Sequence, residues 1–290
     1  MSGELPENDI EVARDLPSEV LTQISAMYPF LNKNEFDTYM EKATKIEAGN
    51  PIQEISALIG LLDNPHATFK KSKLTRNINN HETNPEKLPS SELMDNVLYI
   101  NVPTLSGIQL EDLENVFLPY KDTSEGVIID LRENGGGSEV AVRRFAEKYF
   151  IKKGEHKGGI NIQIAPGGGL RHIQIPADSV NDTPYEKPVV ILTSDKTFSS
   201  AERFIAIMKT GTDCVLIGSE TRGGSANPVQ TDIEYEGVNY TVSIPTWRFF
   251  LQGETKPIED TKIKPDIPYE KEDIVDFAVQ HIKDTIKKAN

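Results

Sequence analysis

The sequence has almost no cysteine: Cys214 is the only one in 290 residues. A single thiol excludes a disulfide framework and a cysteine-based metal site. Cys214 opens the apolar run Cys-Val-Leu-Ile at 214–217, which is typical of a buried strand rather than of an exposed nucleophile. No two histidines have the spacing of metal ligands, and nothing else in the sequence indicates a metal or an organic cofactor.

Long apolar segments are also missing. No run approaches the roughly 18 apolar residues that a membrane span needs. The first residues, MSGELPENDIEVARDL, are polar and acidic, without the basic start and apolar centre of a signal peptide. As written, the sequence predicts a cytoplasmic protein without a membrane span; a periplasmic or extracellular location would follow if a signal had been removed.

Positive charge is scarce. Lys and Arg number 31 against 45 Asp and Glu, a net charge of −14, so a polyanion is repelled on average. Nucleic acid and anionic membranes are therefore poor partners, and we interpret the acidity as a source of solubility. With 37% hydrophobic and 26% charged residues, the chain has an ordinary globular composition that can bury a core.

Apolar residues at helical spacing mark the first part of the chain. Leu21, Ile24 and Tyr28 repeat with the period of a helix, as do Ile55, Leu58 and Leu62. We therefore expect helices over residues 17–63. The expected organisation is an N-terminal helical subdomain (1–75), a polar linker (76–94) and a catalytic core (95–290).

From residue 97 on, short apolar runs rich in β-branched residues alternate with helical patterns. The runs are 97–102, 126–131, 188–193 and 213–218, and the helical stretches lie near 108–118, 138–151, 199–210 and 272–287. This alternation predicts a layered α/β domain with strands covered on both faces. Residues 228–250 alternate like a hairpin with Glu236-Gly237 as its turn.

Two strand-to-helix junctions could carry chemistry. Residues 130–138 read Asp-Leu-Arg-Glu-Asn-Gly-Gly-Gly-Ser, in which glycines allow a sharp turn with exposed N–H groups. A phosphate loop is excluded by the missing lysine, and a tight turn is the ordinary alternative. Residues 193–202 place Ser199 and Ser200 at a helix start. With Glu202 three residues after Ser199, a capping box and a nucleophile are about equally good interpretations, and they are compatible.

A serine nucleophile needs a base and an orienting carboxylate. Of the five histidines, only His66, in Asp-Asn-Pro-His, has a rigid context next to a helical run. Glu259 or Asp260, in Pro-Ile-Glu-Asp, could orient it. On these residues alone, a surface histidine and a solvated acidic turn are the ordinary alternatives.

Taken together, four segments in this order resemble the tail-specific proteases, serine peptidase family S41. That family includes C-terminal processing peptidases, the tricorn core protease and retinoid-binding-protein modules. The matching segments are VIIDLRENGGG (127–137), VVILTSDKTFSSAERFIAIMK (189–209), VLIGSETRGGSANP (215–228) and IEDTKIKPDI (258–267). The resemblance covers about residues 95 to 270, and its first two segments are the specific ones.

The resemblance also indicates a branch. In processing peptidases a lysine is the general base, but Gly224 stands at that position and no lysine occurs from 210 to 255. The tricorn-like branch instead implies His66 as the base and Glu259 as the carboxylate. Pro65 stands where that branch has a further polar residue, which leaves Thr68 as a weak substitute, and Lys262 replaces a family glycine.

The resemblance thus implies a peptidase on a crotonase-like (ClpP/crotonase) core. Ser199 would attack a polypeptide substrate, with His66 and Glu259 as partners. The expected oxyanion-hole and supporting residues are Gly136, Gly137, Ser200, Asn134, Gly223, Gly224 and Thr68. The stretch 70–93 is too short for the family's PDZ domain, so we expect a minimal chain. A homo-oligomer stays open, and the alternative is a non-catalytic binding module for an apolar ligand or a peptide.

Overall fold

The computed structural model describes residues 15–30, 32–72, 87–152, 160–164, 171–173, 183–224, 227–251 and 253–289. Its helices are α1 (Leu16–Met27), α2 (Lys33–Ala43), α3 (Pro51–Gly60), α4 (Leu110–Phe117), α5 (Glu139–Tyr149), α6 (Ser200–Gly211), α7 (Ile258–Thr261) and α8 (Ile274–Ala289). Its strands are β1 (Thr68–Lys71), β2 (Ser90–Met94), β3 (Val97–Asn101), β4 (Gly126–Asp130), β5 (Ile160–Ile164), β6 (Arg171–Ile173), β7 (Val189–Thr193), β8 (Val215–Gly218), β9 (Val229–Tyr235), β10 (Val238–Ile244), β11 (Trp247–Phe250) and β12 (Ile267–Pro268). Among the residues so described, no helix has the length and apolar character that crossing a membrane requires.

The three N-terminal helices begin where the sequence provides caps. Asp15, Asn32 and Asn50 each accept a backbone N–H three residues later, at 3.3, 2.9 and 3.0 Å. Such caps satisfy donors that have no partner inside the helix. Proline at the first turn of α1 and of α3 adds a preset φ and removes a donor that the turn leaves unpaired. The expectation of helices over 17–63 is therefore confirmed.

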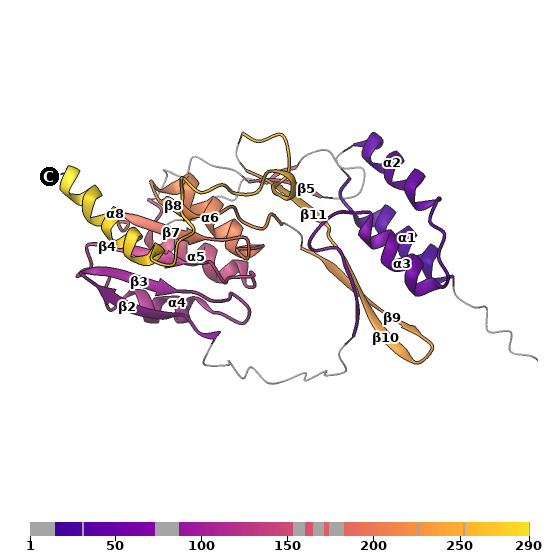
Figure 1. Cartoon of the computed structure of the whole chain (residues 1–290), viewed down its shortest axis with the longest axis horizontal. Helices are drawn as coiled ribbons and strands as arrows, with labels where there is room; N and C mark the ends of the chain where they lie inside the picture. The colour runs from indigo at the N-terminus through magenta and orange to yellow at the C-terminus, as the bar shows by residue number, and fades with distance from the viewer. Residues whose placement is uncertain are drawn as a thin grey trace, which may run out of the picture.

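The main sheet has six strands in the order β12-β8-β7-β4-β3-β2. Neighbouring strands are parallel, except that β2 is antiparallel to β3. The four apolar runs of the sequence are β3, β4, β7 and β8, in the middle of this sheet. Figure 1 shows α4, α5 and α6 on one side of it and α8 on the other. The predicted mixed α/β architecture is confirmed.

Burial on both faces follows from the two-residue period of a strand. In β4, Val127 and Ile129 belong to the core under α4, α5 and α6, whereas Ile128 between them belongs to the core under α8. All five residues of β4 are buried, as are all five of β7. This explains why these strands read as continuous apolar runs instead of alternating ones.

A second hydrophobic core lies at the other end of the molecule. There α1 and α3 bury side chains such as Ile24 and Ile55 against Val242 and Ile244 of β10. Strand β1 pairs antiparallel with β10, which forms a hairpin with β9. The hairpin thus lies between β8 and β12 of the main sheet in sequence but packs with the N-terminal helices in space (Figure 1). This core joins residues from both sides of the expected boundary at residue 75.

Two further expectations concern the connections. The predicted turn at Glu236-Gly237 is confirmed: both residues have positive φ, 49° and 74°, as a tight two-residue hairpin turn requires. Of the expected linker 76–94, residues 90–94 form the edge strand β2, and residues 76–86 lie outside the described part.

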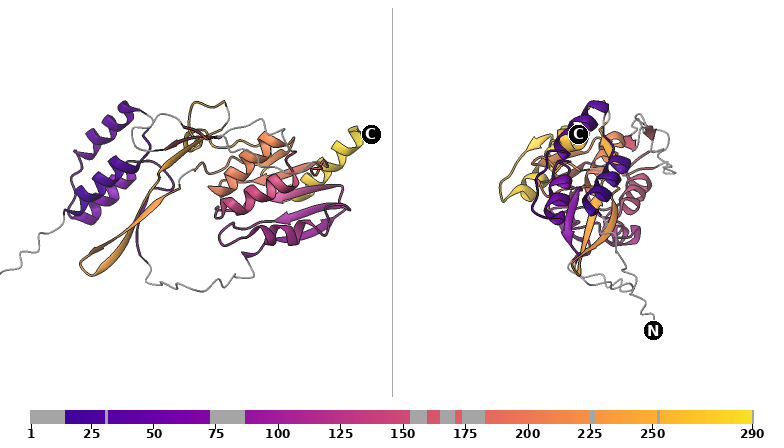
Figure 2. Two further views of the ribbon diagram at one scale, coloured as in Figure 1. Left: turned by 180° about the vertical axis from the view of Figure 1, so that it is seen from behind. Right: turned by 90° about the vertical axis from the view of Figure 1, so that its right-hand side faces the viewer.

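A third sheet, in the order β11-β5-β6, lies between the two ends (Figure 1; seen from behind in Figure 2). Strand β11 runs antiparallel to β5, and the short helix α7 packs on β11. The middle of the molecule therefore brings together residues that are far apart in sequence, and the site described below lies there.

The hairpin turn provides a stability test. Gly237 has a φ of 74° with open space around it, so Gly237→Ala introduces only backbone strain. We expect it to lower the free energy of unfolding by about 1–2 kcal/mol. Gly60, the last residue of α3, also has open space but no positive φ, so Gly60→Ala is the matched control and should gain about 0.5–1 kcal/mol. Denaturant midpoints with unchanged slopes would measure both; equal effects would contradict the strain argument.

Candidate active site

Ser199 lies at the junction between β7 and α6 in a strained conformation. Its φ is 59° and its ψ −119°, values that non-glycine residues rarely adopt. The neighbouring turn leaves no room for a side chain: a Cβ on Gly136 would lie 2.8 Å from the Ser199 Cβ and 2.9 Å from the Phe198 carbonyl oxygen. Such strain persists only where the surroundings enforce it, and it is concentrated at functional sites.

The buried side chain of Asn134 holds the glycine turn beside Ser199. Its Nδ2 donates to the Val102 carbonyl at 2.8 Å, and its Oδ1 accepts the Gly136 N–H at 2.9 Å. Its own carbonyl accepts the Phe198 N–H at 2.9 Å. Asn134 therefore ties the glycine turn to the residue that precedes Ser199. The hydrogen bond to Asn134 Oδ1 occupies the Gly136 N–H. That N–H is therefore not available for the oxyanion hole in which the sequence predicts it.

Two other backbone N–H groups at this turn are not occupied. Within the described residues, neither Gly137 nor Ser200 donates a hydrogen bond from its backbone nitrogen. Gly137 has a φ of +141°, and a Cβ there would lie 2.1 Å from Leu105 backbone atoms. The Ser200 hydroxyl donates to the Gly137 carbonyl at 2.9 Å, so the two residues lie together. Both flank Ser199 closely.

Glu202 connects Ser199 to a second glycine-containing loop. Its fully buried carboxylate accepts the backbone N–H groups of Ser199, Gly223 and Gly224 at 2.9, 2.8 and 3.0 Å, and also the Thr221 hydroxyl. The bond from the Ser199 N–H is the Glu202 half of the expected capping box. Burial raises the pKa of this carboxyl to about 7, and its hydrogen bonds oppose that rise.

Gly224 stands at the position that corresponds to the lysine base of the processing peptidases. A Cβ there would lie 2.0 Å from the Phe198 ring, so no side chain fits. Gly223 has a φ of +81°, and its Cβ would lie 2.7 Å from the Ile258 carbonyl oxygen. Packing therefore requires glycine at both positions.

His66 lies against the ring of the residue next to Ser199. The His66 and Phe198 ring centroids are 4.3 Å apart with an interplanar angle of 22°. The His66 Nε2 is buried and has no hydrogen-bond partner in the described part of the chain. Burial, and then the charge of Arg222, lower the pKa of His66 to about 4, so the imidazole is neutral at physiological pH.

Asn64 joins His66 to Glu259, across 195 residues of sequence. Its Oδ1 accepts the His66 backbone N–H at 3.0 Å, and its Nδ2 donates to Glu259 Oε1 at 3.4 Å. Sequence reasoning missed Asn64, although an asparagine two residues before the histidine is a typical turn-former whose side chain bonds nearby N–H groups. Thr68, the substitute considered there, opens β1 opposite Ser243.

Arg248 of β11 supports the Glu259 side of this arrangement. The guanidinium is 5% exposed and donates to Glu35 Oε1 of α2 at 2.7 Å. Burial disfavours its charge, but the Tyr28 phenol and the Glu259 and Glu35 carboxylates together raise the pKa of Arg248. The carboxylate of Asp260 lies 3.9 Å from the same guanidinium. One buried cation therefore faces acidic groups from both α2 and α7.

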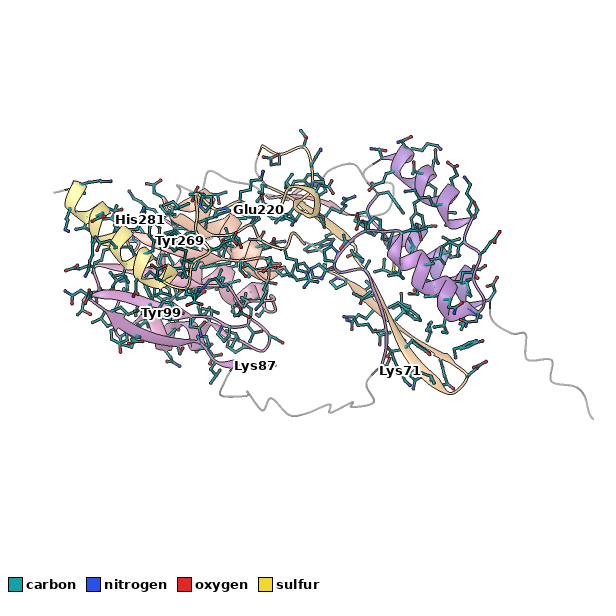
Figure 3. All side chains as sticks on the ribbon, in the orientation of Figure 1. Lys71, Lys87, Tyr99, Glu220, Tyr269 and His281 are labelled. Carbon is teal, nitrogen blue, oxygen red and sulfur yellow. The ribbon has the colours of Figure 1, made fainter. Side chains whose placement is uncertain are left out.

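The other candidate residues lie elsewhere. His281 is on α8 (Figure 3), across the main sheet from α6. His81 and His156 lie outside the described residues, and of His172 only the backbone, in β6, is described. Cys214 is 3% exposed, and burial raises the pKa of its thiol to about 11, which fits the expected buried, inert thiol, although the residue directly precedes β8 and does not belong to it.

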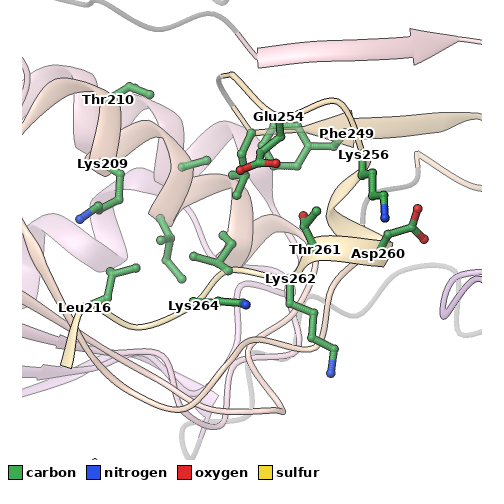
Figure 4. A pocket seen from close by; sticks show the side chains of 14 residues that line it. Lys209, Thr210, Leu216, Phe249, Glu254, Lys256, Asp260, Thr261, Lys262 and Lys264 are labelled. Atoms are coloured by element: carbon green, nitrogen blue, oxygen red, sulfur yellow. The ribbon is translucent and has the colours of Figure 1, made fainter. Parts of the chain in front are cut away.

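A cavity of about 280 Å³ opens beside Ser199 and Ser200. A larger one, of about 690 Å³, lies between α6, β11 and α7, and its rim carries Lys256, Lys262 and Lys264 (Figure 4). Neither Ser199, His66 nor Glu259 lines the larger cavity. Among the described residues, no group of histidine, cysteine and acidic side chains could hold a metal ion.

Comparison with known proteins agrees with this geometry. Residues 96–269 match the family described as peptidase family S41. The chain belongs to peptidase family S41. It is 28% identical over 201 residues to the carboxy-terminal processing protease CtpA of Bacillus subtilis (strain 168), a match that covers 68% of this chain and 40% of CtpA. The chain thus spans less than half of the length of that relative.

Two solved structures resemble the whole S41 chain. A putative peptidase from Parabacteroides merdae ATCC 43184 has a TM-score of 0.65 at 16% identity and covers 93% of this chain and 96% of its own. A lipoprotein from Streptococcus agalactiae has a TM-score of 0.62 at 15% identity and covers 98% and 99%. At such identities the likeness is one of fold.

The Glu202 hydrogen bonds can be tested by stability. In Glu202→Gln an amide N–H₂ would face backbone N–H groups that now donate to the carboxylate, so donors stay buried without acceptors. We expect the free energy of unfolding to fall by about 1–3 kcal/mol. Glu220→Gln, on the same loop as Thr221 but with a side chain 49% exposed, is the matched control and should change it by less than about 0.5 kcal/mol. Equal effects of the two changes would contradict the assigned role.

Proposed function

We propose that this protein is a serine endopeptidase in which Ser199 Oγ attacks the carbonyl carbon of a peptide bond. The observation that carries the proposal is the strained backbone of Ser199 at the start of α6, against a glycine turn with no room for a Cβ. A sharp strand-to-helix turn of this kind exposes a nucleophilic hydroxyl and places free backbone N–H groups beside it.

His66 takes the proton from Ser199 Oγ and returns it to the leaving amine. Two features support this role: the imidazole is neutral above pH about 4, and its buried Nε2 has no partner among the described residues. Its ring already packs on Phe198, next to the nucleophile. Catalytic hydrogen bonds are often incomplete without substrate, so we expect the hydrogen bond between His66 and Ser199 to form when a peptide binds.

Glu259 stabilises the imidazolium that forms, and Asn64 is the residue that positions the two. Asn64 accepts the backbone N–H of His66 and donates to Glu259. It thus supplies the further polar residue next to the histidine that the resemblance implies and that Pro65 does not provide. Arg248 lies within electrostatic reach of Glu259, and the attraction between the two helps to raise the pKa of the arginine. The negative charge of a carboxylate favours a charged imidazole.

The backbone N–H groups of Gly137 and Ser200 form the oxyanion hole in this proposal, and Gly136 supports their turn through Asn134. The start of α6 adds the favourable end of its helix dipole. Losing one such donor typically costs about 3–4 kcal/mol of transition-state stabilisation. The substrate is a polypeptide, and the finer crotonase-like description of the core stays a prediction.

Two serines at the same turn provide the first test. Ser199→Ala should remove nearly all turnover of an unfolded polypeptide and all labelling by a fluorophosphonate probe, because it deletes the nucleophile. Ser200→Ala keeps its backbone N–H and loses only the bond to the Gly137 carbonyl, so it should retain much of both. The reverse ranking would transfer the role to Ser200. Absence of labelling and turnover in the unmodified protein would leave the binding-module alternative.

The histidine mechanism predicts the pH dependence. The base must be neutral, so kcat/KM should rise with pH through the pKa of free His66, near 4 rather than near the ordinary value of about 6.5. Arg222→Gln removes a nearby cation and should move this limb to higher pH. Lys283→Gln, whose lysine pairs with Asp95 on another part of the surface, should leave it in place. A rising limb near pH 9 would instead indicate a lysine base.

A further inference from the structure

The cavity of about 280 Å³ beside Ser199 is lined by both apolar and charged side chains. Trp247 and Phe249 of β11 and Pro228 are apolar, whereas Arg203 and Glu139 are charged, and the Arg203 guanidinium lies 5.8 Å from the centre of the Phe249 ring. This volume is at the lower limit of the roughly 300–1,000 Å³ of pockets that hold whole small molecules. It therefore suits one side chain of a bound polypeptide.

Arg203 is a buried cation in the wall of this cavity. It lies in the first turn of α6, and its backbone N–H donates to the Ser199 carbonyl at 3.1 Å, so the two residues are neighbours. Its side chain is only 10% exposed, and burial lowers the pKa of its guanidinium. Nη2 pairs with Glu139 Oε1 at 2.6 Å, while Nε has no partner in the described part of the chain. Keeping such a cation buried is costly unless its donors gain a partner.

Glu139 determines which kind of substrate side chain can bind beside Arg203. It starts α5, its side chain is 34% exposed, and it lines the same cavity. A carboxylate entering the cavity would meet Arg203 but also the like charge of Glu139. An apolar side chain would exclude water and leave guanidinium donors without acceptors. A carboxamide avoids both costs, because its oxygen accepts from arginine and its N–H₂ donates to a carboxylate.

We infer that this cavity is the specificity pocket for the residue whose carbonyl Ser199 attacks, and that the Arg203–Glu139 pair selects a carboxamide side chain, glutamine or asparagine. The aromatic and proline side holds the CH₂ stem of that side chain, and the ion pair binds its end. The inference rests on the proposed peptidase function and extends it to a substrate class.

The test compares kcat/KM for quenched peptides that differ only in that residue: Gln, Asn, Glu, Leu or Lys. We expect Gln or Asn to exceed both Leu and Glu by about tenfold or more, because a site built for hydrogen bonds rejects analogues that cannot make them. A preference for Leu, or equal values for all five, would overturn the inference while leaving the peptidase function intact.

Two variants test the ion pair itself. Glu139→Gln removes the negative charge and should reverse the order, so that Glu is cleaved faster than Gln. Arg203→Met should abolish the preference for a carboxamide over Leu. Lys209→Met, on the same helix but paired with Asp266 outside the cavity, should keep the original order. Should Arg203→Met unfold, as thermal unfolding would show, the half-exposed Glu139→Gln decides alone, and an unchanged order there overturns the inference.

A binding measurement separates this inference from the proposed function. Peptides that end in Gln, Glu or Leu mimic the product and can be titrated into the inert Ser199→Ala protein. Tenfold tighter binding of the peptide ending in Gln supports the pocket assignment, and equal affinities overturn it. If the unmodified protein neither cleaves nor reacts with fluorophosphonate, the peptidase function fails, and this titration still decides the pocket.

Discussion

The arrangement around Ser199 depends on one buried carboxylate. Glu202 lies on the first turn of α6, is fully buried, and accepts hydrogen bonds from Ser199, Thr221, Gly223 and Gly224. Burying a carboxylate costs free energy unless its lone pairs are satisfied, and here two loops supply the donors. Neither loop is a regular element, so without this acceptor their N–H groups would be buried without partners. The strained backbone at Ser199 is held by the same bonds.

A second constraint is that the site draws on two separate cores. Ser199 and its glycine turns are built on the main sheet, whereas Asn64 and His66 follow α3 of the helical end. The two parts are joined by polar contacts: Asn64 to Glu259, and Arg248 to Glu35. Stacking of His66 on Phe198 adds an apolar contact at the same place. Disturbing the contacts between the two cores would thus move His66, the proposed base, away from Ser199, the proposed nucleophile.

Phe198 links the glycine at position 224 to the packing of His66. Its ring occupies the space that a side chain at Gly224 would need, and it also contacts the His66 ring and lies under the Arg222 guanidinium. A lysine at 224 would have to displace Phe198, which would also remove the surface on which the imidazole packs. The same aromatic ring thus requires glycine at position 224 and supplies the surface against which His66 packs.

The sequence by itself determined the local structure. Apolar runs with a two-residue or a 3.6-residue period and the Glu236-Gly237 turn each act over a few residues, so strands, helices and the hairpin could be read directly. The roles of Ser199 and His66, which motif order and the missing lysine indicate, stay predictions, and the structure places His66 beside Phe198, the residue before Ser199.

Only the tertiary structure decided which of these groups contact one another. The hairpin's packing on the N-terminal helices, the bridge from Asn64 to Glu259 and the burial of Arg248 all join residues far apart in sequence, where no local period constrains them. The Gly136 N–H is a further case: the glycine pattern predicts an exposed donor, but the side chain of Asn134 reaches it first. Hydrogen bonds of this kind depend on where buried side chains point, which packing determines and sequence spacing does not.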